Sequence, residues 1–298
     1  MDQLQSMQVF VRVADARGFA EAGRQLHMSP PAVTRAITAL EEVVGARLLV
    51  RTTRSVALTE AGARYYDDCV RILADIAEAA AAAAGSFASP TGTLTVTAPV
   101  MFGQQYVLPL LLDFLERHPQ LVVRTIFVDR VVSLVDEGID LAVRIGHLPD
   151  SGLSAVRVGS VRRVVCGAPR YFERHDAPAT PSDLGSHSII ASTSAWASTE
   201  WRFGQEDRSV VHVQPRLFCN TNEAAVQAAI AGWGLTRLLS YQVAPALLAG
   251  DLQTVLSDYE AAPLPVHIVH AERRHAPAKV RQFIDFAAER LRSNRLIN

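Results

Sequence analysis

The sequence predicts an α/β protein in two parts: a small N-terminal domain of helices with one β-hairpin, and a long helix leading into a larger α/β domain of two lobes. Three patterns predict this fold class. Apolar residues over 1–58 recur at helical spacing and end in two short β-rich runs. Helical periodicity then continues over 59–84. Beyond residue 91, β-rich and helical segments alternate, which is typical of a mainly parallel sheet.

Length and composition agree with this division. A chain of 298 residues suits two or three domains, and 49% hydrophobic with 20% charged residues is ordinary for a globular protein. Its apolar stretches fall short of the ~20 residues that span a bilayer. The N-terminus shows neither the basic nor the apolar segment of an export signal. We therefore expect a cytoplasmic protein with no membrane partner, whose three separated cysteines are reduced and buried.

The first 44 residues predict three helices. The first ends near Gly18, and apolar residues at helical spacing over 19–26 predict the second. After a short turn, Ser29 is placed as the N-cap of the third helix. Pro30 and Pro31 occupy its first turn, where a missing N–H costs nothing.

The third predicted helix has two contrasting faces. Its apolar face consists of Val33, Ile37, Leu40 and Val44. Its opposite face carries Thr34, Arg35 and Thr38. Two helices joined by a tight turn, with such side chains outward, suit the major groove of double-stranded DNA, where arginine reads guanine and threonine contacts bases or backbone. The alternative is a three-helix bundle whose polar face is merely solvated.

A β-hairpin is predicted directly after the third helix. Two β-rich runs within 48–58 flank a polar turn, and the segment 43–59 holds three arginines and no acidic residue. On this hairpin, Arg51 and Arg54 are candidates for phosphate or minor-groove contacts. Residues 1–58 therefore predict a winged helix-turn-helix domain.

The long helix starts from Thr59 as its cap and extends to about Ala84. Its smaller and apolar residues alternate spacings of four and three, which makes a heptad seam of about three repeats. The seam consists of Gly62, Tyr66, Cys69, Leu73, Ile76, Ala80 and Ala83. With nothing else to cover this seam, two copies are expected to pair through it as a homodimer. We place the linker helix and its hinge at 59–90.

Residues 91–298 predict two lobes with a cleft between them. The first alternating set has strands at 94–98, 121–128 and 140–145, and helices up to 117 and over 131–137. A second set occupies 164–262, and the chain returns through a strand at 265–270 and a helix at 277–293. Lobe I is thus 91–163 with 264–298, and lobe II is 164–263. Pro109 predicts a kink in the first helix of lobe I.

Strand ends and helix N-termini point to a ligand site in this cleft, because α/β proteins bind ligands at carboxyl ends of strands and anions at helix N-termini. The residues so placed are Pro99, Val100, Met101, Phe102, Arg144, Ser192, Thr193, Thr221 and Asn222. Each has a purely structural alternative. Thr221 and Asn222 suit helix capping, and Arg144 suits an ion pair. An aromatic residue such as Phe102 usually belongs to a core.

The sequence shows no catalytic or metal-binding motif. It contains no GxSxG, no HExxH and no Cys–His neighbourhood resembling a nucleophile. His267 and His270 fall on opposite faces of a predicted strand, which prevents them from chelating one metal ion. We therefore expect no enzyme, no metal site and no cofactor.

The segment 19–62 contains the strings FAEAGRQLHMSPPAVTRAI, LEEVVGARLLVRTTR and LTEAG. They resemble the signature of LysR-type transcriptional regulators, and the order of segments along the whole chain resembles that family too. The resemblance implies a C-terminal domain like the periplasmic binding proteins, with a small organic effector, an acid among the candidates, held between its lobes. It also implies operator DNA as a partner, assembly into homotetramers, and RNA polymerase as a candidate partner.

The family's DNA contacts in the recognition helix fall here on Pro30, Pro31, Thr34 and Arg35, and its wing contact falls on Arg51. This chain departs from the family twice. Pro30 stands where many members have Gln, which removes a base-reading amide, and Thr34 replaces the usual Ser. Both departures bear on the operator sequence and not on DNA binding itself.

Effector binding is expected to change the angle between the lobes and so the spacing of the DNA-binding heads across half-sites. The alternative is a solute-binding protein whose N-terminal helices are a dimerisation module, against which the missing export signal argues.

Overall fold

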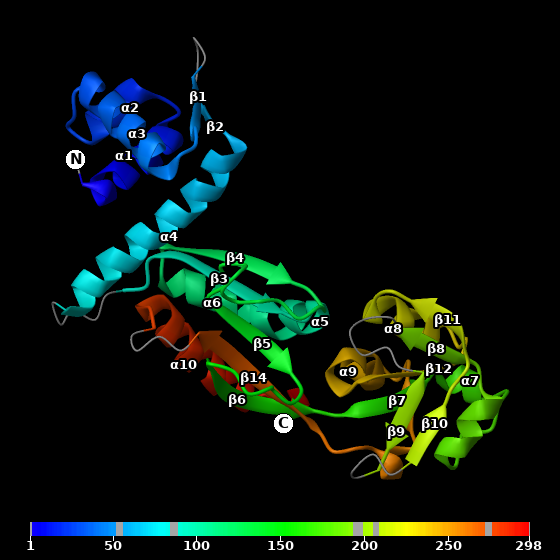
Figure 1. The fold of residues 1–298 in the computed structure, drawn as a ribbon. Helices are drawn as coiled ribbons and strands as arrows, with labels where there is room; N and C mark the ends of the chain where they lie inside the picture. The colour runs from blue at the N-terminus through cyan, green and yellow to red at the C-terminus, as the bar shows by residue number, and fades with distance from the viewer. Residues whose placement is uncertain are drawn as a thin grey trace. The chain divides into compact units, whose positions relative to one another are not determined.

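The computed structural model describes residues 2–51, 56–83, 89–192, 199–204, 209–271 and 276–297. It divides into two compact units, Met1–Gly92 and Thr93–Asn298, whose elements are labelled in Figure 1. Within these described ranges, no helix is both long enough and apolar enough to cross a lipid bilayer.

The first unit is built from helices and one antiparallel β-hairpin. Its elements are α1 (Gln3–Ala16), α2 (Phe19–Gln25), α3 (Pro30–Val44), β1 (Leu49–Arg51), β2 (Val56–Leu58) and α4 (Glu60–Ala83). Burial of apolar side chains from α1, α3 and the start of the hairpin forms one core. The residues in it that are at most 1% exposed include Phe10, Val33, Ile37, Leu40 and Leu48. This is the helical domain with a hairpin that the sequence predicts.

Lobe I of the second unit is a five-stranded mixed sheet with helices, in the strand order β4-β3-β5-β14-β6. Its strands are β3 (Gly92–Ala98), β4 (Leu121–Phe127), β5 (Leu141–Ile145), β6 (Leu153–Val161) and β14 (Leu264–Ala271). Its helical segments are α5 (Val100–Phe102), η1 (Gly103–Val107), α6 (Leu108–Arg117), α10 (Ala278–Arg292) and η5 (Arg295–Ile297). Helices α6 and α10 meet in the lobe I core, where the rings of Phe114 and Phe283 lie 5.3 Å apart.

Lobe II has a second five-stranded sheet, in the order β11-β8-β12-β7-β13, and a separate two-stranded hairpin. The strands of its sheet are β7 (Arg163–Gly167), β8 (Ile189–Ser192), β11 (Pro215–Cys219), β12 (Leu235–Leu239) and β13 (Gln253–Val255). The hairpin is β9 (Glu200–Phe203) with β10 (Ser209–His212). The helical segments are α7 (Pro169–Phe172), η2 (Pro181–Ser186), α8 (Asn222–Ile230), α9 (Ser240–Ala249) and η4 (Ser257–Tyr259). Separate apolar clusters lie on either face of this sheet.

The chain passes from the lobe I sheet to the lobe II sheet between β6 and β7, and it returns between β13 and β14. Both sheets are mixed, since β14 runs antiparallel to β5 and β6, and β12 runs antiparallel to β7. The prediction of a helix-turn-helix unit followed by a two-lobed α/β domain is confirmed. The sheets are less parallel than expected because β14 in lobe I and β7 in lobe II each run antiparallel to both of their neighbours.

The helix predicted over 131–137 is wrong, because the segment forms turns. Its apolar residues are buried at alternate positions, with Val132 and Leu134 inside and Val131 and Val135 exposed. That alternation does not match the continuous buried face of a helix.

The predicted irregularity near Pro109 takes a specific form. A single π-helical turn, η1, precedes α6, and Pro109 is the second residue of α6. Because proline lacks an N–H, the backbone before it must change its hydrogen-bond pattern, and a π-turn is one way to do so.

One buried charge ties the last helix to the first strand of lobe I. Lys279 of α10 is 7% exposed, and its ammonium group donates to the carbonyl oxygen of Thr93. Its Nζ also lies 3.6 Å from the Asp140 carboxylate, which in turn accepts the N–H of Thr95 at 2.7 Å. A buried ammonium needs such partners to offset its lost hydration.

Candidate nucleic-acid interface and ligand cavity

The turn between α2 and α3 is tight, and glycine makes it possible. The N–H of Met28 donates to the carbonyl oxygen of Gly23 at 2.8 Å, and His27 between them adopts a left-handed φ of 53°. A Cβ atom at Gly23 would lie 2.8 Å from the carbonyl oxygen of Met28, so a side chain there would force the turn open. This turn fixes where α3 begins.

Helix α3 begins at Ser29, as predicted, but the cap is made by backbone. The N–H groups of Ala32 and Val33 donate to the Ser29 carbonyl oxygen at 2.9 and 3.1 Å. The Ser29 side chain makes no capping hydrogen bond: Pro31 has no N–H, and the N–H of Ala32 is taken by the Ser29 carbonyl oxygen. Ser29 is thus the N-cap of α3, as predicted.

The two faces of α3 are arranged as the sequence predicts. Its buried residues are Val33, Ala36, Ile37 and Leu40. The candidate DNA-contacting residues Ser29, Pro30, Pro31, Arg35 and Thr38 are exposed, and Thr34 is half-buried. The Arg51 side chain and the whole of Arg54 lie outside the described residues. The candidate residues of α3 thus present one guanidinium, two hydroxyls with their methyl groups, and two proline rings.

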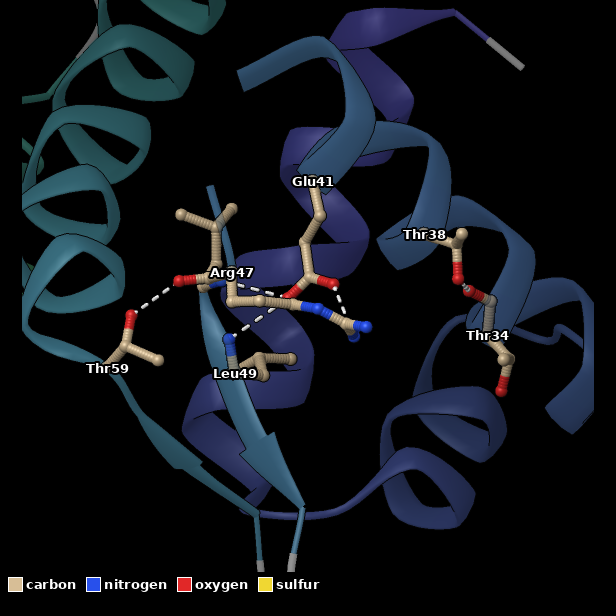
Figure 2. Close-up of polar contacts among 7 residues, drawn as sticks. Thr34, Thr38, Glu41, Arg47, Leu49 and Thr59 are labelled. Carbon is tan, nitrogen blue, oxygen red and sulfur yellow. Dashed lines mark hydrogen bonds and ion pairs between the residues drawn. The ribbon is translucent and has the colours of Figure 1, made fainter. Parts of the chain in front are cut away.

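The carboxylate of Glu41 ties α3 to the first strand of the hairpin (Figure 2). Its Oε1 accepts the N–H of Leu48 at 2.9 Å and the N–H of Leu49 at 3.2 Å. Its Oε2 lies 3.4 Å from Nη1 of Arg47, and the Glu41 side chain is 11% exposed. A carboxylate that accepts backbone N–H groups makes strong charge-assisted bonds. Glu41 therefore fixes the position of the hairpin strand relative to the recognition helix.

Sequence reasoning missed Glu41, although a signal existed. It lies four residues after Ile37 and one after Leu40, so it occupies a place on the apolar stripe of α3. An acid on an apolar stripe is buried at a cost unless it is hydrogen-bonded, so its position indicates partners.

Thr59 connects the hairpin to α4, and Gly62 allows the two to touch. The Thr59 hydroxyl donates to the Arg47 carbonyl oxygen at 2.7 Å and accepts the N–H of Gly62 at 2.8 Å. A Cβ atom at Gly62 would lie 1.9 Å from the carbonyl oxygen of Leu48. The predicted capping role of Thr59 agrees with this geometry.

The first half of the predicted heptad seam is not open to a partner. Gly62 and Cys69 are buried inside the first unit, where burial raises the pKa of the Cys69 thiol to about 11. The Tyr66 hydroxyl donates to the carboxylate of Asp15 on α1. Of the described seam side chains, those beyond Leu73 are exposed, with Ile76 at 43%. The expectation that nothing else covers the seam is therefore wrong for its first half, because α1 and the start of the hairpin cover it.

The second unit contains a cavity of about 250 Å³ whose lining comes from both sheets. Its polar lining residues include Thr97, Asp129, Arg144, His147, Asn222 and Gln242. Its apolar lining residues include Val128, Val132, Val143, Ile145, Leu148 and Tyr241. A mostly apolar cavity with a few converging polar groups is typical of a small-molecule site.

Three of the predicted ligand residues line this cavity: Pro99, Arg144 and Asn222. The guanidinium of Arg144 donates to the carbonyl oxygen of Val132 at 2.8 Å, and Asn222 is 5% exposed. The amide oxygen of Asn222 accepts a hydrogen bond from the Ser192 hydroxyl at 2.8 Å, so Ser192 supports the lining without being part of it.

The predicted anion site at the N-terminus of α5 is already filled. The N–H of Val100 donates to Oδ1 of Asp129 at 3.0 Å, so the protein supplies its own carboxylate there. Asp129 follows strand β4, and the same strand-end argument that selected other residues would have found it. The N–H of Val100 is therefore not free for an external anion, contrary to expectation.

The remaining predicted ligand residues do not line the cavity among the described residues. Phe102 is fully buried in the lobe I core, 5.2 Å from the ring of Tyr241, and Met101 is buried beside it. Thr221 caps α8 by accepting the N–H of Ala224 at 3.2 Å. Thr193 lies outside the described residues.

Tyr241, which sequence reasoning did not single out, joins the two lobes at the cavity. It belongs to α9 of lobe II, is fully buried, and lies edge-on to Phe102 of lobe I. Burial raises the pKa of its hydroxyl, which stays neutral. Its neighbour Gln242 also lines the cavity, and its side-chain oxygen accepts the N–H of Leu239 at 2.8 Å. Tyr241 and Gln242 both come shortly after the end of β12.

A helix-turn-helix unit ahead of a two-lobed α/β unit that encloses a ligand-sized cavity defines a one-component transcription regulator. The family model for the bacterial regulatory helix-turn-helix protein, lysR family, matches residues 4–63. The model for the LysR substrate binding domain matches residues 87–292. The chain belongs to the LysR-type transcriptional regulators.

Relatives and solved structures agree with this assignment. An uncharacterized HTH-type transcriptional regulator of Haemophilus influenzae is 33% identical, over 94% of this chain and 98% of its own length. The HTH-type transcriptional activator AaeR of Escherichia coli is 30% identical, over 96% of this chain and 93% of its own. The structure of CrgA, a LysR-type transcriptional regulator from Neisseria meningitidis, is 28% identical with a TM-score of 0.63, covering 97% of this chain and 99% of that one.

Proposed function

We propose that this regulator binds operator DNA through α3 and the hairpin, and that a small organic molecule in the cavity of the second unit modulates this binding. The observation that carries the proposal is the lining of the cavity by residues of both sheets, with Pro99 and Arg144 from lobe I and Asn222 and Tyr241 from lobe II. A ligand that contacts both lobes favours one arrangement of them over another.

The DNA-binding half of the proposal is tested with DNA from upstream of the chain's own gene. Arg35→Ala removes the exposed guanidinium of α3 without touching its buried face. We expect the wild type to shift this DNA at low salt and the variant to lose most of the binding, with circular dichroism unchanged. A wild type that shifts no genomic fragment contradicts the proposal and favours a solute-binding protein or an enzyme.

The chemistry of the cavity favours a ligand that is an organic acid. Arg144 and His147 are basic groups in its lining, while the acidic Asp129 is already bonded to a backbone N–H. Arg130, also in the lining, is held by two hydrogen bonds to Glu137 at 2.9 and 3.0 Å. Within the described residues Arg144 donates one N–H to the Val132 carbonyl oxygen, and its guanidinium has further N–H groups to offer a carboxylate.

The ligand half is tested with a panel of small monocarboxylates and of the matched neutral amides. Thermal shift of the full chain should find acids that stabilise it and amides that do not, and Arg144→Gln should abolish the difference. The best acid is then added to a DNase footprint of the operator. Identical footprints with and without the acid at saturation would refute modulation.

We further propose a homodimer whose α4 contact lies beyond Leu73, where the described seam is exposed. Ile76→Glu should shift the sedimentation velocity profile toward the monomer at micromolar concentration. Arg64→Glu, also exposed on α4 but outside the seam, is the matched control. Unchanged sedimentation of Ile76→Glu would remove α4 from the interface.

No catalytic role, cofactor or membrane partner is proposed, and the protein is proposed to act in the cytoplasm.

A further inference from the structure

The exposed side of α3 offers DNA few hydrogen-bond donors near its N-terminus. Pro30 and Pro31 have no N–H, and the N–H groups of Ala32 and Val33 both donate to the Ser29 carbonyl oxygen. None of these four backbone positions can donate to a base or a phosphate without breaking the start of the helix. Recognition there must rest on side chains.

The hydroxyl proton of Thr38 is already used inside the helix. Its Oγ1 donates to the carbonyl oxygen of Thr34 at 3.1 Å, as Figure 2 shows. A hydroxyl has one proton and two lone pairs, so Thr38 presents to solvent only lone pairs and its γ-methyl group. Thr38 is exposed and belongs to the face opposite Ile37 and Leu40.

Thr34 and Thr38 lie one helical turn apart on the same face. Four residues at 1.5 Å each separate their Cα atoms by about 6 Å along the axis. Successive base pairs are about 3.4 Å apart, so the two side chains face positions about two base pairs apart. The proline rings that precede them extend the same apolar strip.

In the major groove, thymine is distinguished from the other bases by its methyl group, and the methyl of threonine is a matching apolar partner. We propose that Thr38 is a specificity-determining residue that reads a thymine methyl group, with Thr34 reading a second thymine about two base pairs away. The proposal rests on the proposed entry of α3 into the major groove. It assigns Thr38 a contact through carbon, not through its hydroxyl.

The competing contact uses the lone pairs of Thr38 to accept an N–H from adenine or cytosine. Two substitutions separate the two contacts. Thr38→Ser keeps the hydroxyl and removes the methyl, whereas Thr38→Val keeps a methyl in the same place and removes the hydroxyl. Because Thr38 is exposed, neither change disturbs the core of the first unit.

The test begins with duplexes that the full-length wild type enriches from a random pool. Each thymine of the best duplex is then replaced, one at a time, by deoxyuridine, which removes only the methyl group. Affinity is measured by fluorescence anisotropy. Burial of one methyl is worth about 0.8 kcal/mol, which corresponds to about fourfold in affinity.

We expect the wild type to lose about fourfold at two thymines about two base pairs apart. At one of them, Thr38→Ser should bind the thymine and deoxyuridine duplexes equally well. At the other, Thr34→Ser should bind the thymine and deoxyuridine duplexes equally well. Thr38→Val should keep the deoxyuridine effect and bind within about twofold of the wild type. Non-specific binding at low salt, equal in all variants, shows that they are folded.

Two results overturn the proposal: a deoxyuridine effect as large in Thr38→Ser as in the wild type, or a Thr38→Val variant that loses more affinity than Thr38→Ser. If the wild type enriches no sequence at all, the proposed function itself fails, and the assignment of Thr38 falls with it. If sequences are enriched but uracil has no effect, only this assignment is wrong.

Discussion

Replacing Glu41 by alanine tests whether one carboxylate holds the hairpin in place. The change removes the acceptor of the N–H groups of Leu48 and Leu49, at 2.9 and 3.2 Å, next to a core in which Leu48 is fully buried. A hydrogen bond to a charged group contributes about 1.5–3 kcal/mol. Since one oxygen atom serves both amides, we take the lower figure for each, or about 3 kcal/mol together. That corresponds to a local opening equilibrium raised about 100-fold.

The assay is amide hydrogen exchange of the full chain, followed in peptides that contain Leu48 and Leu49. Glu41→Ala should accelerate exchange there by about 100-fold. Glu41→Gln, which keeps a neutral acceptor oxygen, should accelerate it by about tenfold, because the charge-assisted bond is about twice as strong as a neutral one. Glu42→Ala is the matched control, since Glu42 is exposed on the same helix.

Unchanged exchange at these amides in Glu41→Ala would refute the reasoning. Exchange in Glu41→Gln as fast as in Glu41→Ala would refute it too. The functional consequence follows from the same contact. If Glu41 aligns the hairpin with α3, Glu41→Ala should weaken specific DNA binding more than non-specific binding, because specific binding needs both elements in register.

Three other measurements test particular contacts. Gly62→Ala should destabilise the first unit by about 3 kcal/mol in urea unfolding, because its Cβ would lie 1.9 Å from a carbonyl oxygen. Gly18→Ala, whose Cβ would find its nearest neighbour at 3.7 Å, should cost about 1 kcal/mol, because alanine is a poorer N-cap for α2 than glycine. Burial lowers the pKa of His187 below its ordinary 6.5. Its contribution to the free energy of unfolding is therefore complete above pH 6.5 and is lost as the pH falls through the lowered pKa. His187→Asn should make the stability of the second unit depend less steeply on pH below 6.5. Burial raises the pKa of Cys166 to about 12 and that of Cys69 to about 11, so iodoacetamide at about pH 8 should leave these thiols intact by mass spectrometry until urea is added.

The recognition helix was predictable because its signals are local. The apolar spacing of Val33, Ile37 and Leu40 and the Ser-Pro-Pro start both act within one helix, and the structure follows them. The carboxylate of Glu41 was missed because its partners, in the hairpin strand, become neighbours only when the chain folds back. A sequence pattern shows that a side chain leaves the solvent, but not which backbone groups meet it.

The expected ligand site shows the same limit. The sequence placed Val100 at a helix start, yet the carboxylate that occupies its N–H comes from Asp129, 29 residues further along the chain. Phe102 was assigned to the cavity by its position near a strand end, but it packs behind Tyr241 instead. Which aromatic ring faces a cavity depends on how lobe II packs against lobe I, and no local pattern carries that information.

The prediction that the whole of the long helix is an open seam was wrong in its first half for a related reason. A heptad pattern reports a continuous apolar stripe, but it does not distinguish a second copy of the helix from another helix of the same chain. Here the first turns of α4 pack within the first unit, where Tyr66 donates to Asp15 of α1 and Cys69 is buried.

The single lysine of the chain, Lys279, is enclosed between Thr93 and Asp140. Acetyltransferases and amine-reactive crosslinkers therefore have no accessible lysine side chain to modify on the folded protein. Most of its positive charge lies on arginine, whose guanidinium stays protonated throughout the physiological range. Lysine modification therefore leaves the charge of the helix-turn-helix unit unchanged, because that unit contains no lysine.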